Sequence, residues 1–178
     1  MDIAIRLSTE KDAYIIKNLY PLYLHDLSEQ NGTLPNKHGI YEESDEYVTL
    51  NDQCEVLNIW WTKPNALFPF LILVDDNPAG FIFVATPPYC LKGNDYFLNE
   101  IFLLRPYRGK GIAEEAVTNV FDRFKGKWGL FTCPSPDVTG EKFWRKTVSR
   151  YSNGNFTEEY EDTIDGNKLV FRFDNSSF

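Results

Sequence analysis

The sequence is poor in cysteine and histidine, and this scarcity limits the chemistry that the chain can perform. Among its 178 residues there are three cysteines and two histidines. Cys54, Cys90 and Cys133 are odd in number and widely spaced, which argues against a disulfide framework and against a cysteine-rich zinc site. His25 and His38 are too few for a histidine-based metal centre. We therefore expect no bound metal and a reducing, cytoplasmic location.

Long apolar runs are also missing from the sequence. No stretch approaches the roughly 20 apolar residues that a membrane helix needs. The N-terminus lacks a basic region followed by an apolar core, which is the pattern of a secretory signal. We expect no membrane partner.

Positive charge is in deficit. The chain has 18 lysines and arginines against 26 acidic residues, and its net charge is −8. Such a chain repels nucleic-acid phosphates, and no basic stripe offsets the repulsion, so no nucleic-acid partner is expected. The field favours a cationic or amine-bearing partner, unless the negative charge serves only to keep the protein soluble.

What the sequence does contain is typical of a folded domain. Apolar residues make up 43%, aromatic residues 16% and charged residues 25% of the chain, which is an ordinary globular composition. The length suits one domain with a real hydrophobic core, and neither a repeat nor a flexible linker interrupts it. We predict a single domain over residues 1–178.

The pattern of apolar residues predicts strands and helices in sequence. Residues 3–7 alternate as a strand, and residues 8–27 form a helix that Ser8 or Thr9 caps and that Pro21 breaks or kinks into two pieces. The further elements are a polar surface segment at 28–47, a short helix or strand at 54–61, strands at 68–76, 79–87, 94–104 and 127–133, helices at 109–124 and 135–151, and a hairpin at 156–173. This order indicates a mixed α/β (α+β) fold around one central sheet.

The junction between the strand at 94–104 and the helix at 109–124 reads Arg108-Gly-Lys-Gly-Ile-Ala113. The N-terminus of a helix leaves backbone N–H groups without partners, and the helix dipole adds partial positive charge there. Gly109 and Gly111 carry no side chain that would keep a ligand from these groups. The junction therefore suits a phosphate or pyrophosphate, with Arg108 and Lys110 as possible charged contacts.

Two common phosphate motifs do not match this junction. A P-loop needs Lys and then Ser or Thr after its last glycine, and Ile112 follows Gly111. A dinucleotide fingerprint needs a third glycine where Glu114 stands. A different phosphate-binding motif is required.

The strand, the motif and the amphipathic helix together resemble the coenzyme A-binding segment of the GNAT family of N-acetyltransferases. The family pattern is Q/R-x-x-G-x-G/A, and Arg108, Gly111 and Ala113 match its fixed positions. The order of the other expected elements also resembles the family over most of the chain. The resemblance implies a central, mixed, mostly antiparallel sheet flanked by helices, with a cofactor cleft between the fourth and fifth strands.

The resemblance also implies which residues bind acetyl-CoA. The backbone at the end of the fourth strand, at Phe102, Leu103 and Leu104, would pair with the pantetheine arm. The pyrophosphate would rest on the amides of the turn, with Arg108 beside it. The residues of that turn are Gly109, Lys110, Gly111, Ile112 and Ala113.

Acetyl transfer to an amine needs a group that accepts a proton, because an amine is mostly protonated at neutral pH. Glu100 interrupts the apolar strand just before the expected pantetheine site, where members of the family often carry an acidic base. Partial burial would raise its pKa into a useful range. Alternatively, Glu100 is an exposed residue or an ion-pair partner. We expect Asn99 to point to the opposite face of the strand.

The general acid is where the sequence departs from the family. The family's N-x-x-A-x-x-F-Y pattern in the last helix falls on Asp137, Gly140, Phe143 and Trp144, so that the usual tyrosine is a tryptophan. Trp144 has no hydroxyl proton to donate, and we expect it to pack against the core or the cofactor arm. Asp137 would contact the cofactor as the family's asparagine does. The sequence leaves open whether an acid is needed and, if so, which residue serves. Candidates are Tyr107, Ser135 and Tyr151.

Other chemically active residues have simpler interpretations. We expect Cys133 to be an unreactive thiol, His25 to be a packed or surface residue, and His38 to lie in the variable segment, where it could touch a substrate. The aromatic and acidic residues of the segments at 41–47 and 60–61 either line a site for a cationic acceptor or form a solvated loop over an apolar patch. The residues concerned are Tyr41, Glu42, Glu43, Asp45, Glu46, Tyr47, Trp60 and Trp61.

We therefore expect an acetyl-CoA-dependent N-acetyltransferase that acts on a primary amine of a small molecule or peptide, by direct attack in a ternary complex. The alternative is a non-catalytic acyl-CoA-binding sensor or regulatory relative, which the missing tyrosine supports. A longer acyl donor is a further possibility. The sequence does not identify the amine, and it is compatible with a monomer or a homodimer.

Overall fold

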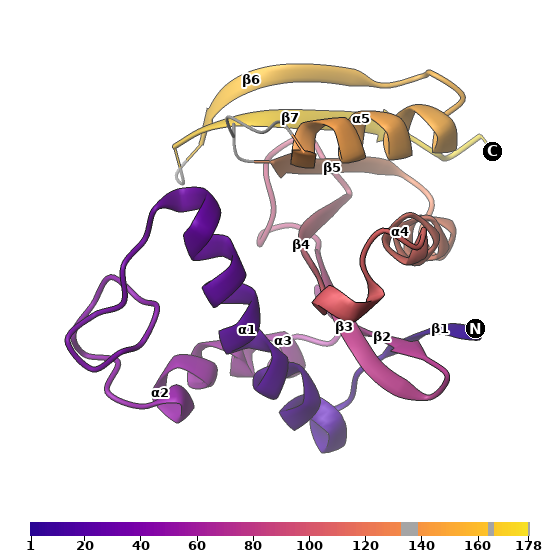
Figure 1. Cartoon of the computed structure of the whole chain (residues 1–178). Coiled ribbons are helices and arrows are strands. Elements are labelled where there is room, and N and C mark those ends of the chain that lie inside the picture. The colour runs from indigo at the N-terminus through magenta and orange to yellow at the C-terminus, as the bar shows by residue number, and fades with distance from the viewer. Residues whose placement is uncertain (133–138, 164–165, 178) are drawn as a thin grey trace.

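A computed structural model describes residues 1–132, 139–163 and 166–177, and one seven-stranded sheet runs through it (Figure 1). The strands are β1 (Ile3–Leu7), β2 (Leu67–Val74), β3 (Asn77–Ala85), β4 (Tyr96–Leu103), β5 (Lys127–Thr132), β6 (Thr157–Thr163) and β7 (Gly166–Asp174). Their order in the sheet is β1-β2-β3-β4-β5-β7-β6. β4 and β5 are parallel and all other neighbours are antiparallel, which confirms the predicted mixed, mostly antiparallel sheet.

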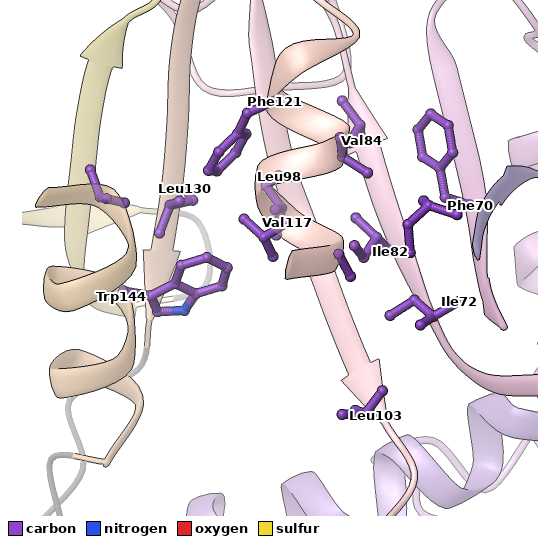
Figure 2. Packing of buried hydrophobic residues seen from close by; sticks show 14 of the residues in the cluster. Phe70, Ile72, Ile82, Val84, Leu98, Leu103, Val117, Phe121, Leu130 and Trp144 are labelled. Carbon is purple, nitrogen blue, oxygen red and sulfur yellow. The ribbon is translucent and has the colours of Figure 1, made fainter. Parts of the chain in front are cut away.

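Helices cover both faces of the sheet. They are α1 (Ala13–Asn31), α2 (Leu50–Glu55), α3 (Ile59–Thr62), α4 (Ile112–Asp122) and α5 (Thr139–Tyr151). Side chains from α4 and α5 pack with one face of the sheet, as Figure 2 shows for Val117, Phe121 and Trp144. Side chains from α1 and α3, such as Ile16 and Trp60, pack with the other face. None of the helices in the described part of the chain is both long and apolar enough to cross a membrane.

The central strands are apolar on both faces because helices cover both of them. Along β2 and β3 the buried residues alternate between the two clusters: Phe70, Ile72 and Ile82 face α4, whereas Leu71 and Phe81 face α1. The two strands meet in a tight hairpin at Asp75-Asp76, where both residues have positive φ angles of 49° and 63°. Two positive φ angles at the centre of a two-residue turn are typical of type I′, whose twist suits antiparallel strands.

The predicted break at Pro21 is wrong, because α1 continues through Pro21 as one helix from residue 13 to residue 31. Proline has no N–H to donate to the carbonyl four residues earlier, which is that of Lys17. In this fold the thiol of Cys54 donates to the Lys17 carbonyl oxygen instead, at 3.1 Å. A partner from α2 thus replaces the lost bond.

The start of the first helical segment is as predicted, since Thr9 and Asp12 form a capping box at a 3-10 turn that leads into α1. The region at 54–61, which the sequence left as helix or strand, is helical. A second capping box, between Thr49 and Asp52, begins α2. Between α1 and α2 the chain forms turns and bends without a helix or strand until residue 50.

Candidate functional site

The sheet opens between β4 and β5. The two strands pair only from Tyr96 to Leu98, opposite Trp128 to Leu130, although β4 continues to Leu103. The cause is a bulge in β4: Phe83 of β3 lies opposite Glu100 and the next residue lies opposite Leu98, so that Asn99 is an extra residue. A bulge bends its strand and increases the local twist. Beyond Leu98, β4 therefore separates from β5, as predicted for the cofactor cleft.

The end of β4 presents backbone groups to this opening. Leu104 donates its N–H to the Ala79 carbonyl oxygen at 2.8 Å, and Leu103 lies opposite Gly80. Because peptide groups alternate sides along a strand, those of Phe102 also turn toward β3, while those of Ile101 and Leu103 turn toward the opening. Of the three residues predicted for the pantetheine arm, only Leu103 therefore faces the opening with its backbone.

Ile101 is a backbone candidate that the sequence analysis missed. Which side of β4 its peptide groups take depends on the register with β3, and the register depends on the bulge at Asn99. A single sequence gives no signal for that register. The peptide groups of Ile101 and the N–H group of Leu103 form a short strand edge inside the fold, to which an extended chain can add. The Leu103 carbonyl oxygen already accepts a hydrogen bond from Nε of Arg108.

The turn before α4 exposes a row of backbone N–H groups. Gly109 and Gly111 have φ angles of 74° and 80°, and a side chain at either position would meet nothing within 4 Å. Gly111 caps α4 without any side-chain hydrogen bond. Among the described residues, none accepts a hydrogen bond from the N–H groups of residues 109–113. These open donors at the positive end of a helix dipole fit an anion such as a pyrophosphate.

The basic side chains of the turn are held by the protein itself. Arg105 and Arg108 both form ion pairs with Asp26 of α1, whose pKa is lowered by hydrogen bonds from the two guanidinium groups despite partial burial. Arg108 also donates from Nε to the Leu103 carbonyl oxygen at 2.7 Å. Lys110 donates to the Pro106 carbonyl oxygen at 2.7 Å. The turn is thereby fixed to α1 and to the end of β4.

Glu100 lies on the wall of the opening, on the side of α1. Its Oε2 atom is buried and has no hydrogen-bond partner among the described residues. Burial raises the pKa of Glu100 to about 7. A carboxyl group with that pKa is partly ionised near neutrality and can exchange a proton with a ligand.

The structure corrects the expectation for Asn99. The bulge places Asn99 and Glu100 along the same cleft, not on opposite faces of β4. Strict alternation of side chains holds only for a regular strand, and the extra residue of a bulge interrupts it.

The cleft in front of Glu100 has a volume of about 1050 Å³. Its walls come from the second half of α1, the segment after it, the loop between β3 and β4, the middle of β4, and residues of β5, β6 and β7. The lining residues are Tyr23, Leu27, Asn31, Glu43, Pro88, Tyr89, Cys90, Leu91, Lys92, Phe97, Asn99, Glu100, Phe131, Thr163 and Lys168. The cleft is large enough for a small-molecule or peptide acceptor.

Two tyrosines of α1 stand close to Glu100, and the sequence analysis did not single them out. Tyr23 lines the cleft. Its ring is edge-on to the rings of Phe81 and Phe102, with distances between ring centres of 5.8 Å and 5.9 Å. The pKa of Tyr20 is raised, first by burial and then by the nearby charge of Glu100. In the sequence both residues are indistinguishable from the packed face of a helix.

The candidates for the general acid lie in different parts of the molecule. Trp144 is buried in the core between α5 and the sheet, which confirms the expectation that it packs (Figure 2). Tyr151 donates to Asp122 at the far end of α4 from the glycine turn, with an oxygen–oxygen distance of 2.8 Å, so it does not face the cleft. Tyr107 packs beside the core. The predicted positions Cys133, Ser135 and Asp137 lie outside the described residues.

The remaining candidates are mostly structural. Trp60 is buried and stacks on Phe83, and Trp61 donates to the Ser8 hydroxyl oxygen at 3.2 Å, so neither lines the cleft. Of the residues proposed for an acceptor wall at 41–47 and 60–61, only Glu43 lines it. His25 is an exposed residue.

His38 is also exposed, and it is not part of the cleft lining. Within the described ranges, no group of three or more metal-ligating side chains is present.

Comparison with known proteins gives a family and a fold. The sequence model described as Acetyltransferase (GNAT) family matches residues 33–146. No curated protein matches the sequence significantly.

Several solved structures share the fold at low sequence identity. The N-acetyltransferase PaiA from Thermoplasma acidophilum, in complex with coenzyme A, has a TM-score of 0.65 at 15% identity, covering 98% of this chain and 99% of that one. The aminoglycoside acetyltransferase AAC(6')-Ib with coenzyme A gives 0.67 at 16% identity, covering 99% and 97%. The ribosomal-protein-S5-alanine acetyltransferase from Vibrio fischeri gives 0.64 at 16% identity, covering 99% and 95%.

Proposed function

The chain belongs to the acetyltransferase (GNAT) family, and from this premise we propose that it transfers the acetyl group of acetyl-CoA to a primary amine. The observation that carries the proposal is the carboxyl group of Glu100. Its Oε2 atom is buried and has no hydrogen-bond partner among the described residues, and the side chain lines a large cleft where β4 leaves β5. Enzymes place proton acceptors with raised pKa values in such clefts.

The donor half of the site fits coenzyme A by its chemistry. Open N–H groups at residues 109–113 would hold the pyrophosphate, and the backbone of Ile101 and Leu103 would pair with the amides of the pantetheine arm. Acetyl-CoA would supply the thioester whose acetyl group is transferred. Arg108, which forms an ion pair with Asp26, would add positive charge beside the turn. Asp137 is retained as a proposed contact on the basis of the family pattern alone.

Glu100 would act on the acceptor. An ammonium group is not a nucleophile, so one proton must leave before the amine can attack. Ionised Glu100 accepts that proton, directly or through a water molecule. The N–H groups at the edge of β4 can donate to the carbonyl oxygen as negative charge develops on it. Within one ternary complex the amine nitrogen then bonds to the carbonyl carbon and the carbon–sulfur bond breaks, without an acyl-enzyme. Coenzyme A leaves as a thiolate, which takes up the second proton that the nitrogen loses and becomes the free thiol.

The proposal includes both small-molecule and peptide amines. Among the similar folds, one enzyme is named for aminoglycosides and another for the alanine of a ribosomal protein. The cleft of about 1050 Å³ is compatible with either class.

Replacing Glu100 tests the proposed base. We expect Glu100→Gln to lower kcat/KM by about 10²- to 10⁴-fold, the range of general-base catalysis, while the affinity for coenzyme A is retained. In the wild type, kcat/KM should rise with pH through about 7 as Glu100 ionises, and this limb should disappear in the variant. Release of free thiol from acetyl-CoA, measured with a panel of amines, gives the rates.

A matched control is Glu43→Gln, which removes an exposed carboxylate from the same cleft and should keep the pH limb. An unchanged rate and pH profile in Glu100→Gln would show that another group accepts the proton.

A second candidate function is a non-catalytic acyl-CoA-binding sensor. The buried Trp144, where the family often has a tyrosine, favours it. Binding of acetyl-CoA without amine-dependent thiol release from any acceptor would support the sensor and contradict the transferase.

A further inference from the structure

The loop between β3 and β4, residues 86–95, supplies a continuous wall of the cleft. Five consecutive residues, 88–92, line the cleft, which is more than any single helix or strand contributes. The loop contains turns and bends but neither a helix nor a strand. Such a segment has no ladder of backbone bonds to keep its shape. The shape of this wall therefore depends on the contacts that fix the loop to the sheet.

Both ends of the loop are bound to the sheet. At the first end, the N–H and the hydroxyl group of Thr86 donate to the Ala66 carbonyl oxygen, at 2.8 Å and 3.2 Å. At the other end, Asp95 donates its N–H to the Lys127 carbonyl oxygen at 2.8 Å. The carboxylate of Asp95 accepts the Lys127 N–H, also at 2.8 Å. The loop is thus held next to β2 and at the start of β5, and the wall lies between these two points.

Asn94 fixes the turn that carries the wall. Its Nδ2 atom donates to the Leu91 carbonyl oxygen at 3.0 Å. The thiol of Cys90, a weak donor, lies 3.9 Å from the Asn94 carbonyl oxygen. Leu91 and Cys90 line the cleft, whereas Asn94 is not part of the lining and is only 5% exposed. Asn94 therefore holds two lining residues in place without facing the cleft itself.

The side chain of Asn94 lies against Gly129 of β5. A Cβ atom at Gly129 would lie 2.6 Å from Oδ1 and 2.8 Å from Nδ2 of Asn94, which is closer than real Cβ atoms approach. Gly129 pairs with Phe97 on one side and with Arg172 on the other, so its position in the sheet is fixed. The missing side chain at Gly129 therefore provides the space that Asn94 fills.

The amide of Asn94 is incompletely paired. Its Oδ1 atom is buried and has no hydrogen-bond partner among the described residues. A buried amide oxygen without a partner lowers the stability of a fold. Stability alone therefore does not account for an asparagine at this position. What Asn94 provides is a fixed position for the turn and for the wall that the turn carries.

We propose that Asn94, packed on Gly129, is a positioning residue that sets which acceptor the cleft accepts. The inference rests on the acetyl transfer proposed above and concerns its acceptor side. Asn94 acts through the wall at residues 88–92, which lines the same cleft as Glu100. A fixed wall holds a bound amine in one place, and small displacements of a substrate are costly in rate. The donor turn follows the opposite end of β4, so binding of acetyl-CoA does not depend on Asn94.

Asn94→Ala tests the positioning role. Thiol release from acetyl-CoA is measured with three amines: phenethylamine, kanamycin and a peptide that begins with alanine. The variant should raise the KM for the preferred amine by about tenfold and reduce the preference among the three, because the acceptor is held less well. The KM for acetyl-CoA should not change. Asn18→Ala, which removes an exposed amide of α1 outside the cleft lining, should leave both KM values unaltered.

Gly129→Ala tests the contact beneath Asn94. The added methyl group should displace the Asn94 side chain and raise the same KM. In the double variant with Asn94→Ala the methyl group has space, so the second change should add little to the first. Fully additive effects would show that Gly129 acts independently of Asn94.

Labelling of Cys90 reports on the turn without any acetylation. Burial raises the pKa of the Cys90 thiol, and the nearby charge of Asp95 raises it further, so the thiol should react slowly with iodoacetamide. Asn94→Ala should accelerate this reaction several-fold by releasing the turn. The buried Cys54 is the internal reference for a general loss of structure. Mass spectrometry of the digested protein distinguishes the labelled peptides.

The outcomes separate this inference from the proposed function. Faster labelling of Cys90 together with a raised KM for the amine alone supports the inference. Unchanged labelling, or faster labelling with an unchanged KM for the amine, overturns it and leaves the transferase intact. An equal rise in the KM for acetyl-CoA also overturns it, because the effect is then not confined to the acceptor side. Acetyl-CoA binding without acetylation of any of the three amines contradicts both proposals.

Discussion

Glu100 is a carboxyl group whose charged form is disfavoured by its surroundings. Burial raises its pKa to about 7 in the folded protein, whereas an unfolded chain has a value near 4.3 for glutamate. Between these two pH values the folded state binds more protons than the unfolded state. The free energy of unfolding therefore falls as pH rises through this window, and the full penalty is present above pH 7. The same carboxyl group that suits the reaction weakens the fold at neutral pH.

The penalty predicts a pH-dependent effect of Glu100→Gln on stability. Because glutamine cannot ionise, the variant should gain stability relative to the wild type as pH rises from 5 to 8, by roughly 3 kcal/mol at most. Urea unfolding at several pH values, followed by circular dichroism, measures the difference. For Glu43→Gln, at an exposed site, the free energy of unfolding should change with pH in the same way as that of the wild type. Parallel curves for Glu100→Gln would contradict the raised pKa.

At the scale of an element, the start of α4 is shaped by its glycine turn. The helix begins at Ile112, and Gly111 precedes it in a left-handed conformation with φ 80°. Residues with a Cβ rarely adopt that conformation, but Asn and Asp tolerate it better than most. Asn and Asp are also comparable as N-caps. At this position Asp therefore introduces a negative charge, and Asn, which has nearly the same shape without the charge, serves as its control.

Gly111→Asp and Gly111→Asn form this test of the anion site. Both variants should fold, and Asp should be at least as stable as Asn because its charge suits the positive end of the helix. Asp should nevertheless bind coenzyme A at least about tenfold more weakly than Asn, because its carboxylate competes with the pyrophosphate for the same N–H groups. Isothermal titration calorimetry gives the two affinities. Equal affinities would place the pyrophosphate elsewhere.

At the scale of the whole molecule, Asp26 joins the two halves of the site. It lies on α1, whose neighbouring residues Tyr23 and Leu27 line the acceptor cleft. It binds Arg105 and Arg108, which are 79 and 82 residues away in the sequence and belong to the segment before α4. One carboxylate thus ties the acceptor wall to the donor turn. The single domain over residues 1–178 stays a prediction, and the sheet that runs from β1 to β7 supports it.

We expect Asp26→Asn to raise the KM for acetyl-CoA by several-fold, with a smaller effect on kcat, because the turn loses its anchor. A double-mutant cycle with Arg108→Gln should be non-additive, since both changes remove the same contact. Glu10→Gln, which removes an exposed carboxylate from the 3-10 turn that leads into the same helix, should leave the KM unchanged. A loss of thermal stability without any change in KM would reduce Asp26 to a structural role.

Much of the fold and part of the site could be predicted from the sequence. The apolar periods predicted the strands and the apolar stripe of α4, and Gly109 and Gly111 predicted the turn before that helix. The interruption of an apolar strand singled out Glu100. The continuous helix through Pro21 could not be predicted, because it depends on the distant thiol of Cys54. The placement of Asn99 and Ile101 could not be predicted either, because it follows from the bulge between β3 and β4.

The sequence by itself determined the mixed α/β fold, the open amides before α4 and a carboxyl group near the end of β4. These features depend on local residue patterns, which do not require contacts between distant parts of the chain. Only the tertiary structure decided that β4 separates from β5 after Leu98, that Asp26 anchors the arginines, and that Lys168 and Glu100 face one cleft. Contacts between residues so far apart depend on strand register and helix packing, which no local pattern specifies.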